Sequence, residues 1–388
     1  MADDKRDFDI IVFGATGYTG KLVAQHMAAA HAKDGVRWAI AGRNAGKLEE
    51  LRAGLGAAPD IVVADSDDTA SLERMCPRTK VVVSTAGPYQ LYGSNLVAAC
   101  AKTGTDYIDL TGESHWIAQM IAAHEAEAKK TGARLVFSGG FDSIPFDVGV
   151  WFAQEEAKKK FGAHAPRVRG RIRKLKGGLS GGTLASGQAT MAAAAKDPSI
   201  GATLGNPFAL TPGFAGPKQP DGDTPYEDTV AGSWVGPFMM AGINTKAVHR
   251  TNFLLGHTWS RDFQYDEMQM LDGPPSAPTG GLSGFNFGPG GMPKPGEGPS
   301  EEERVSGFYE IVFIAEMADG RTLRAVVNGD ADPGYGSTSK ILAEAGLALA
   351  KRVPHSKVAG GCWTPAAAMA DVLVETLPHT AGLTFAVE

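Results

Sequence analysis

The chain has 388 residues, of which 43% are hydrophobic and 21% charged, a composition typical of folded globular domains and unlike that of disordered chains. Its formal net charge of -6 argues against nucleic acid as a partner, because binding a polyanion requires clustered Lys and Arg. The three cysteines, Cys76, Cys100 and Cys362, are too few and too dispersed for a disulfide framework or a zinc site. No apolar run has the length of a signal or membrane-spanning segment, so we expect a cytoplasmic protein; peripheral membrane contact stays open.

The length predicts two domains, and the first is indicated by short apolar runs that alternate with helical stretches up to about Gly149. This pattern predicts parallel strands joined by crossover helices. We therefore expect residues 1–149 to form an α/β domain with a Rossmann-type, doubly wound parallel sheet. Its predicted strands are Phe8 to Phe13, Arg37 to Ala41, Ile61 to Ala64, Val81 to Thr85, Tyr107 to Asp109 and Arg134 to Ser138.

The texture changes after this domain, and we expect residues 150–352 to form a second, substrate-binding domain. Its predicted elements are a basic strand at Val168 to Lys174, a helix from about Thr183, two strands at Phe308 to Ala315 and Thr322 to Asn328 around an Asp319-Gly320 hairpin turn, and a helix at Ser337 to Arg352. The tail, residues 353–388, is expected to pack back on the first domain. Residues 206–228 and 273–300 are rich in Pro and Gly and predict loops; for the second, a lid and a disordered tether are equally favoured.

A glycine-rich segment directly follows the first predicted strand and opens a helix. It reads Gly14-Ala15-Thr16-Gly17-Tyr18-Thr19-Gly20, and this position is typical of a turn that binds a dinucleotide pyrophosphate at the positive end of a helix. Gly14 permits the tight turn, Gly17 lets the backbone approach the phosphates, and Gly20 allows close packing of helix on sheet. The alternative is a purely structural turn. The predicted cofactor residues here are Gly14, Thr16, Gly17, Tyr18, Thr19 and Gly20.

The end of the second strand indicates which dinucleotide is bound. An NAD enzyme normally has Asp or Glu there, whereas this chain has Arg43, with Lys47 one turn later. Arg43 suits the 2′-phosphate of NADPH, because its planar guanidinium can bind two phosphate oxygens; the alternative is an ordinary solvated residue. Asp65, after the third strand, is placed to reach adenine or to act as a helix N-cap. We therefore predict NADPH as the cofactor.

The fourth strand ends in Thr85-Ala86-Gly87-Pro88, at the edge of the sheet where open α/β folds bind ligands. We expect this segment to flank the nicotinamide, and a simple Gly-Pro turn is the equally weighted alternative. The remaining predicted cofactor residues are thus Thr85, Ala86, Gly87 and Pro88.

With these residues in place, the chain resembles the saccharopine dehydrogenase-like reductases, and among them the bacterial trans-acting enoyl reductases. The resemblance spans nearly the whole chain and rests on Val12 to Gly20, Ala41 to Arg43, Ser84 to Tyr89, Tyr107 to Glu113, Gly140 to Asp147, Gly178 to Thr183, Arg261 to Phe263, Asp332 to Tyr335 and Trp363 to Pro365. It implies an NADP-dependent oxidoreductase with a second, α+β domain like that of dihydrodipicolinate reductase. It also implies enoyl groups of lipid or polyketide chains as substrates, whereas the founding enzymes reduce an imine between amino acids. A family resemblance of this kind supports the identity of the cofactor better than it supports the reaction or the substrate.

Reduction of a C=C, C=N or C=O bond requires a proton, so a general acid should lie near the nicotinamide. Tyr89 is the preferred donor, because a phenol tolerates an apolar substrate while a carboxyl group needs a pKa raised by burial. Asp142 is the second candidate. Its alternative role, shared with Asp147, is to accept backbone N–H groups around Pro145. Other eligible residues at the same edge of the sheet are Tyr92, Glu113 and Ser143.

Two further features of the second domain could bind an anionic group. Ser180, Gly181, Gly182 and Thr183 form a helix-opening turn whose amide groups could hold a carboxylate, thioester oxygen or phosphate of the substrate, and an ordinary N-cap is equally favoured. The strand residues Arg167, Arg169, Arg171 and Arg173 alternate, so they share one face of a sheet. We interpret them as a solvated face, with attraction of an acyl-carrier protein or anionic lipid as the alternative.

No sequence motif of a metalloenzyme or of a serine hydrolase is found, so no metal is predicted. We predict an NADPH-dependent reductase of an enoyl, lipid- or polyketide-like substrate, free or carrier-bound, that forms a homodimer. The alternatives are reduction of an amino-acid imine and a non-catalytic NADPH-binding sensor or scaffold. An apolar cavity would favour the enoyl substrate, and convergent arginines the imine.

Overall fold

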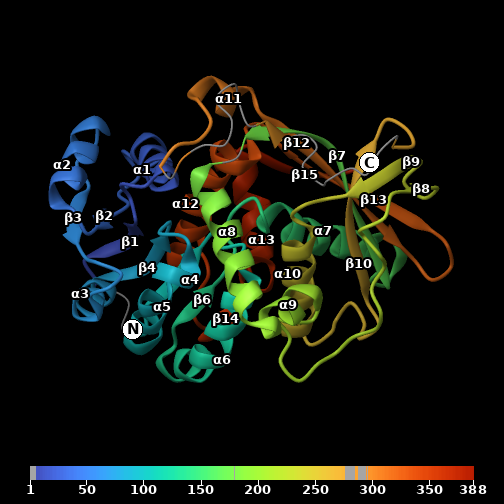
Figure 1. Cartoon of the computed structure of the whole chain (residues 1–388), viewed down its shortest axis with the longest axis horizontal. Helices are drawn as coiled ribbons and strands as arrows, with labels where there is room; N and C mark the ends of the chain where they lie inside the picture. Colours follow the sequence, from blue (N-terminus) through green and yellow to red (C-terminus); the bar gives the residue numbers. More distant parts are fainter. Residues whose placement is uncertain (1–5, 179, 276–284, 287–293, 295) are drawn as a thin grey trace.

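The computed structural model describes residues 6–178, 180–275, 285–286, 294 and 296–388. Within them two sheets lie side by side, one built mainly from the N-terminal part of the chain and one from the rest (Figure 1). No helix of the described residues is long and apolar enough to cross a bilayer.

The first sheet is parallel, with the spatial order β14-β6-β5-β4-β1-β2-β3. The order reverses between β1 and β4, which is the point where Rossmann-type folds bind their ligand. All six predicted strands are present, with ends shifted by at most two residues. The strands are β1 (Phe8–Phe13), β2 (Trp38–Gly42), β3 (Asp60–Val63), β4 (Thr79–Ser84), β5 (Asp106–Asp109), β6 (Arg134–Val136) and β14 (Gly361–Trp363).

Helices cover both faces of this sheet because its strands are apolar on both sides. Alternate residues of β1 show the division: Ile10 and Val12 pack with Val23 of α1, whereas Ile11 and Phe13 pack with Leu96 of α5. The helices of this half are α1 (Tyr18–Ala30), α2 (Ala45–Gly54), α3 (Thr69–Met75), the short α4 (Tyr89–Tyr92), α5 (Ser94–Thr103) and α6 (Ser114–Thr131), with a 3-10 turn at Cys76–Arg78.

The second sheet is mixed and mostly antiparallel, with the order β15-β13-β12-β7-β10-β9-β8 and β11 beside β7. The predicted hairpin is confirmed, and Gly320 in its turn has φ +86°. The strands are β7 (Arg167–Gly178), β8 (Tyr226–Asp228), β9 (Ser233–Pro237), β10 (Gln264–Leu271), β11 (Phe285–Asn286), β12 (Phe308–Glu316), β13 (Thr322–Gly329) and β15 (Leu383–Val387).

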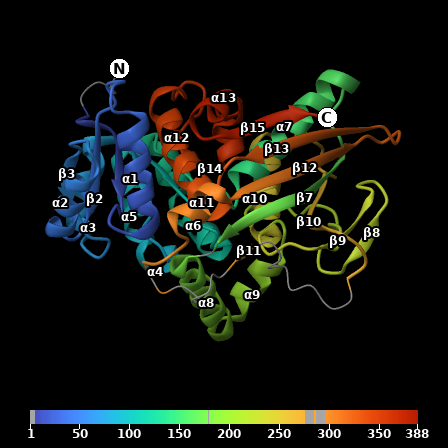
Figure 2. The same ribbon diagram turned by 90° about the horizontal axis from the view of Figure 1, so that it is seen from above.

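The helices of the second half differ in where they pack. Helices α7, α10 and α13 pack together beside the second sheet, whereas α8 and α9 project from the molecule, at the lower edge of Figure 2. The bounds are α7 (Ile144–Phe161), α8 (Gly181–Lys196), α9 (Pro198–Gly205), α10 (Ala241–Leu254), α11 (Glu301–Ser306), a π-helical turn at Pro333–Ser337, α12 (Thr338–Lys351) and α13 (Pro365–Thr380).

The two halves are joined more closely than the sequence predicts. Helix α12, expected in the second domain, packs against β1, β4 and β5 of the first sheet. The predicted boundary at residue 149 falls inside α7, which also contacts β12 and β13. The tail divides, because β14 pairs with β6 of the first sheet and β15 with β13 of the second.

Candidate active site

The glycine-rich turn joins β1 to α1 at the carboxyl edge of the first sheet. Gly14 has φ +79°, a conformation that favours glycine. Gly20 lies so close to the turn that a Cβ atom would be 2.8 Å from both Ala15 Cα and Thr85 Oγ1. Gly17 is the exposed N-cap of α1, and no side chain caps the first amides of the helix. Uncapped amides at a helix N-terminus fit an anionic group such as a pyrophosphate.

The segment after β4 lies against this turn. Thr85 donates hydrogen bonds to Phe13 O from its backbone nitrogen at 2.9 Å and from Oγ1 at 3.0 Å. These bonds hold the ends of β1 and β4 together, so that Ala86 N would be 3.0 Å from a Cβ on Gly14. The predicted Thr85-Ala86-Gly87-Pro88 segment therefore borders the glycine-rich turn.

Arg43 and Lys47 are both exposed at the start of α2. Asn44 caps this helix by accepting the backbone N–H of Lys47 at 3.0 Å. Within the described parts of the chain, neither cationic side chain takes part in an ion pair. Two cations beside a helix N-terminus make a favourable environment for a phosphate group.

Asp65 lies in the loop between β3 and α3. The N-cap of α3 is Asp68, which accepts the backbone N–H of Ser71 at 3.2 Å, so the N-cap alternative for Asp65 is wrong. The Asp65 carboxylate instead accepts the backbone N–H of Asp67 at 3.1 Å. Contact of Asp65 with adenine stays a prediction.

The structure does not favour Tyr89 as a proton donor. Its side chain is 4% exposed, and its hydroxyl group donates to Ser84 O at 3.0 Å. Burial, together with the nearby Asp109 carboxylate, raises the pKa of Tyr89 well above its usual value. The hydroxyl group therefore has a structural role, because it satisfies the last carbonyl group of β4. Sequence pattern could not reveal this, because it does not show which way a side chain points from a turn.

Glu113 also has a structural role here. Its two carboxylate oxygens accept the backbone N–H groups of Tyr89 and Gln90, each at 2.8 Å. These bonds cap the short helix α4, so backbone amides engage both oxygens of this carboxylate. Tyr92, in the same helix, is exposed.

Asp142 lies beside a narrow cavity of about 30 Å³ between the two sheets. The cavity is lined by Leu110, Gly140, Phe141, Asp142, Thr183, Met240, Gly334, Tyr335 and Thr338. Among the described residues the Asp142 carboxyl group has no hydrogen-bond partner, and burial raises its pKa to about 6. The alternative role of binding amide groups around Pro145 is therefore not found. A carboxyl group with a raised pKa can act as a general acid.

Tyr335 is a cavity residue that our sequence reasoning missed. Its hydroxyl group bonds to Ser180 Oγ and to Thr183 Oγ1, each at 2.6 Å. Burial raises the pKa of Tyr335 to about 12 despite these bonds. The ring packs edge-on against Tyr18 of the glycine-rich turn, with centroids 5.1 Å apart. The segment Asp332 to Tyr335 is one of the motifs that carry the family resemblance. This motif could have identified Tyr335 as a candidate site residue.

The turn at Ser180 is an ordinary N-cap. Ser180 Oγ accepts the N–H groups of Gly182 and Thr183, and Gly181 N donates to Glu297 O at 3.1 Å. The amide groups expected to bind substrate are therefore already engaged, and that expectation needs correction. Of the four residues of this turn, only Thr183 lines the cavity.

The described end of the predicted 273–300 loop contacts the glycine-rich turn. Tyr18 donates a hydrogen bond to Pro299 O, and Arg304 donates to the Tyr18 hydroxyl group at 3.1 Å. Gly298 lies against the Tyr18 ring, where a Cβ atom would be 2.6 Å from the ring carbons. Residues 296–300 thus bridge the cofactor turn and the start of α8. Residues 276–284, 287–293 and 295 lie outside the described residues.

Comparison with known proteins identifies the family. Residues 10–136 match the saccharopine dehydrogenase NADP binding domain. A trans-acting enoyl reductase of Mycobacterium ulcerans is 35% identical, with 98% of both chains covered. A provisionally named trans-acting enoyl reductase of Mycobacterium tuberculosis is 37% identical, with 97% of both chains covered. The chain belongs to the saccharopine dehydrogenase-like reductases. This reductase is an NADP-dependent oxidoreductase.

A solved structure supports the same fold. The apo saccharopine dehydrogenase (L-Glu forming) of Saccharomyces cerevisiae has a TM-score of 0.55 with the reductase at 13% identity. The match covers 98% of the reductase and 100% of the yeast chain. Both sheets of the reductase are therefore part of the shared architecture.

Asp147 of the reductase is a structural residue. It accepts a hydrogen bond from Thr251 Oγ1 at 2.5 Å and another from Ala366 N at 2.8 Å. It is fully buried, and burial raises its pKa to about 7. Its partners come from α10 and α13 rather than from around Pro145, so Asp147 joins three helices.

The arginines of β7 are paired rather than solvated, which corrects our interpretation. Arg171 is fully buried and forms ion pairs with Asp228 and Asp266, each at 2.8 Å. Arg169 pairs with Glu316 at 2.5 Å. Arg167 and Arg173 also have carboxylate partners. Neutralised cations attract an acidic partner weakly, so this face loses its support as a docking site for a carrier protein.

Proposed function

We propose that the reductase reduces an enoyl group on a lipid- or polyketide-like acyl chain. The lining of the cavity beside Asp142 carries this proposal. Leu110, Phe141 and Met240 give it apolar walls, and Asp142 is the single charged residue among the nine that line it. An amino-acid imine carries carboxylates, which need cationic partners when they are buried. The absence of lysine and arginine from these nine residues supports an apolar acyl substrate instead.

The cofactor residues proposed here are those of the glycine-rich turn and the two cationic residues at the start of α2. The uncapped amides of α1 would hold the pyrophosphate, and Arg43 with Lys47 would bind the 2′-phosphate. NADPH, when bound, supplies a hydride ion. Asp142 would supply the proton, because its raised pKa keeps the carboxyl group protonated at a higher pH than an exposed aspartate.

Substrate binding would also require the cavity to widen. A volume of about 30 Å³ is far below the several hundred Å³ that ligand pockets usually have. Helix α8 lines the cavity through Thr183, and residues 296–300 contact both the glycine-rich turn and the start of α8. We propose that α8 and residues 296–300 move apart when the substrate enters and close again over it. Closure of these segments over the bound substrate would exclude water during reduction.

The test is turnover by the purified reductase, followed as loss of NADPH absorbance. Medium- and long-chain enoyl thioesters are compared with imines formed from an amino acid and an oxo acid. We expect oxidation of NADPH with the enoyl thioesters. We also expect kcat/KM to fall as the pH rises through about 6, because the proton donor must be protonated.

Asp142→Asn should lower kcat about 100-fold or more and remove this pH dependence. Asp272→Asn, which changes an exposed carboxylate at the end of β10, is the matched control and should leave kcat unchanged. Turnover with imines alone would favour the second substrate class. Tight NADPH binding without turnover of any acceptor would instead favour a sensor or scaffold.

A further inference from the structure

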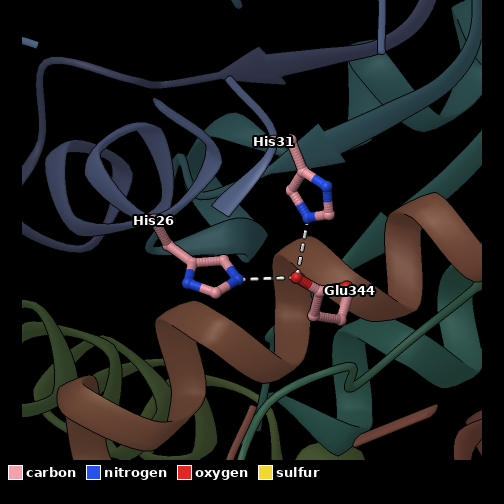
Figure 3. Close-up of side chains that lie close together, drawn as sticks. All are labelled: His26, His31 and Glu344. Carbon is pink, nitrogen blue, oxygen red and sulfur yellow. Dashed lines mark hydrogen bonds and ion pairs between the residues drawn. The ribbon is translucent and has the colours of Figure 1, made fainter. Parts of the chain in front are cut away.

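Two histidines and a glutamate meet between helices α1 and α12, away from the candidate active site. His26 lies within α1, His31 is its C-cap, and Glu344 comes from the middle of α12. Glu344 Oε1 is 2.6 Å from His26 Nε2 and 2.8 Å from His31 Nε2. Figure 3 shows both imidazole rings pointing at this one oxygen atom.

The neighbourhood of this cluster resembles the surroundings of a bound metal ion. His31 Nδ1 lies 2.5 Å from Asp34 Oδ2, so a carboxylate orients the ring and directs Nε2 toward Glu344. Metal-binding histidines commonly have such a carboxylate on their second nitrogen. Among the described residues, no lysine or arginine forms an ion pair with the buried Glu344 carboxylate. The two histidines are its cationic partners when they are protonated, and a bound metal ion would take the place of their protons.

We propose that His26, His31 and Glu344 form a binding site for a divalent transition-metal ion, with Zn²⁺ as the best match. Two imidazoles and one carboxylate are a donor set that zinc accepts in tetrahedral sites with one open position. The nitrogen donors disfavour Mg²⁺ and Ca²⁺, which prefer oxygen ligands. The three donor atoms lie within 4.8 Å of one another.

Only small movements are needed to admit the ion. Ligand atoms in a tetrahedral zinc site are about 3.3 Å apart, so the N–O distances of 2.6 and 2.8 Å must widen by about 0.7 and 0.5 Å. The side chains of His26 and His31 are 13% and 12% exposed, so both rings are partly in contact with solvent, which can supply the fourth ligand. The bound ion would join α1, which carries the glycine-rich turn, to α12.

The test uses the full chain without a histidine tag, because a tag would itself bind zinc. After treatment with a chelator, Zn²⁺ binding is measured by calorimetry and by metal analysis, and Co²⁺ is added as a spectroscopic probe. We expect one ion per chain and the intense visible bands of tetrahedral Co²⁺. We also expect Zn²⁺ to raise the melting temperature, because it binds the folded chain preferentially.

Variants then assign the site. Glu344→Gln and His26→Gln should each abolish stoichiometric binding, and Asp34→Asn, which changes only the positioning carboxylate, should weaken it about 10- to 100-fold. His124→Gln, on α6, is the matched control and should bind normally. The proposal is overturned if the unmodified chain retains no Zn²⁺ or shows no tetrahedral Co²⁺ spectrum, which would leave a hydrogen-bonded cluster only. It is also overturned if the Gln variants bind as the unmodified chain does.

Discussion

At the scale of single residues, the choice between NADPH and NADH depends on Arg43. Its side chain is exposed at the start of α2 and forms no ion pair with a carboxylate of the described residues. Arg43→Asp should weaken NADPH binding at least tenfold more than NADH binding, a difference of about 1.4 kcal/mol. The aspartate repels the 2′-phosphate but can accept a hydrogen bond from a ribose hydroxyl group. Fluorescence titration with both cofactors measures this difference.

The matched control for this prediction is Arg52→Asp. Arg52 lies at the other end of α2 and pairs with Glu49 on the same surface. Its substitution changes the charge of the helix equally but should leave the ratio of the two dissociation constants unchanged. Equal losses of both cofactors in Arg43→Asp would contradict the assignment of Arg43 to the 2′-phosphate.

The buried hydroxyl group of Tyr89 allows a second residue-level prediction. Tyr89→Phe should retain kcat within about threefold, because the hydroxyl group bonds to Ser84 O instead of facing the cavity. It should lower the free energy of unfolding by about 1 to 3 kcal/mol, since a buried carbonyl loses its donor. Denaturant unfolding and steady-state kinetics test both effects. Tyr92→Phe, at an exposed neighbour, is the control. A large loss of kcat at unchanged stability would restore Tyr89 as the donor.

Residues of the cofactor turn could be predicted from sequence because they are contiguous and follow a strand directly. The cavity could not, since Asp142, Thr183, Met240 and Tyr335 come from separate parts of the chain and meet only in the folded protein. The same limit applies to hydrogen bonding. The pattern identified the Ser180 turn as a helix start, but which groups satisfy its amides depends on Glu297 and on the Ser180 rotamer.

At the scale of elements, the contact between α1 and β4 depends on the missing side chain of Gly20. A methyl group there would lie 2.8 Å from Thr85 Oγ1 and would push α1 away from the glycine-rich turn. Gly20→Ala should therefore weaken NADPH binding more than tenfold and cost about 1 to 3 kcal/mol of stability. Calorimetric titration and denaturant unfolding measure the two effects.

Gly187→Ala is the matched control for the Gly20 variant. Gly187 is exposed within α8, and a Cβ atom there would meet nothing within 4 Å. Alanine at that position should stabilise the chain by about 0.5 to 1 kcal/mol, because it favours the helix. Normal NADPH binding by Gly20→Ala would mean that the close packing of α1 does not position the cofactor turn.

Helix α12 shows why the type of an element is easier to predict than its place. Its bounds were predicted to within one residue at each end. Nearly every side of it is buried, including Ile341, Leu342 and Leu349, and a helix that is apolar all round has no single face to indicate its neighbours. Its position along the chain predicted that α12 belongs to the second domain, whereas in the structure α12 packs on the first sheet.

At the scale of the whole molecule, one hydrophobic core extends through both halves. It includes Ile10 of β1 and Phe313 of β12, and Phe141 packs on Tyr309 with ring centroids 4.7 Å apart. We therefore predict a single cooperative unfolding transition in calorimetry. NADPH should raise the melting temperature of this one transition without splitting it. Two resolved transitions, of which NADPH shifts only the first, would show that the halves unfold independently.

The divided tail makes both sheets depend on one short segment of the chain. Residues 361–388 give one strand to each sheet, β14 beside β6 and β15 beside β13, so a chain cut before Gly361 would leave β6 and β13 without these neighbours. Open strand edges pair readily with other chains. We therefore expect such a shortened chain to expose β6 and β13 as new edge strands and to aggregate.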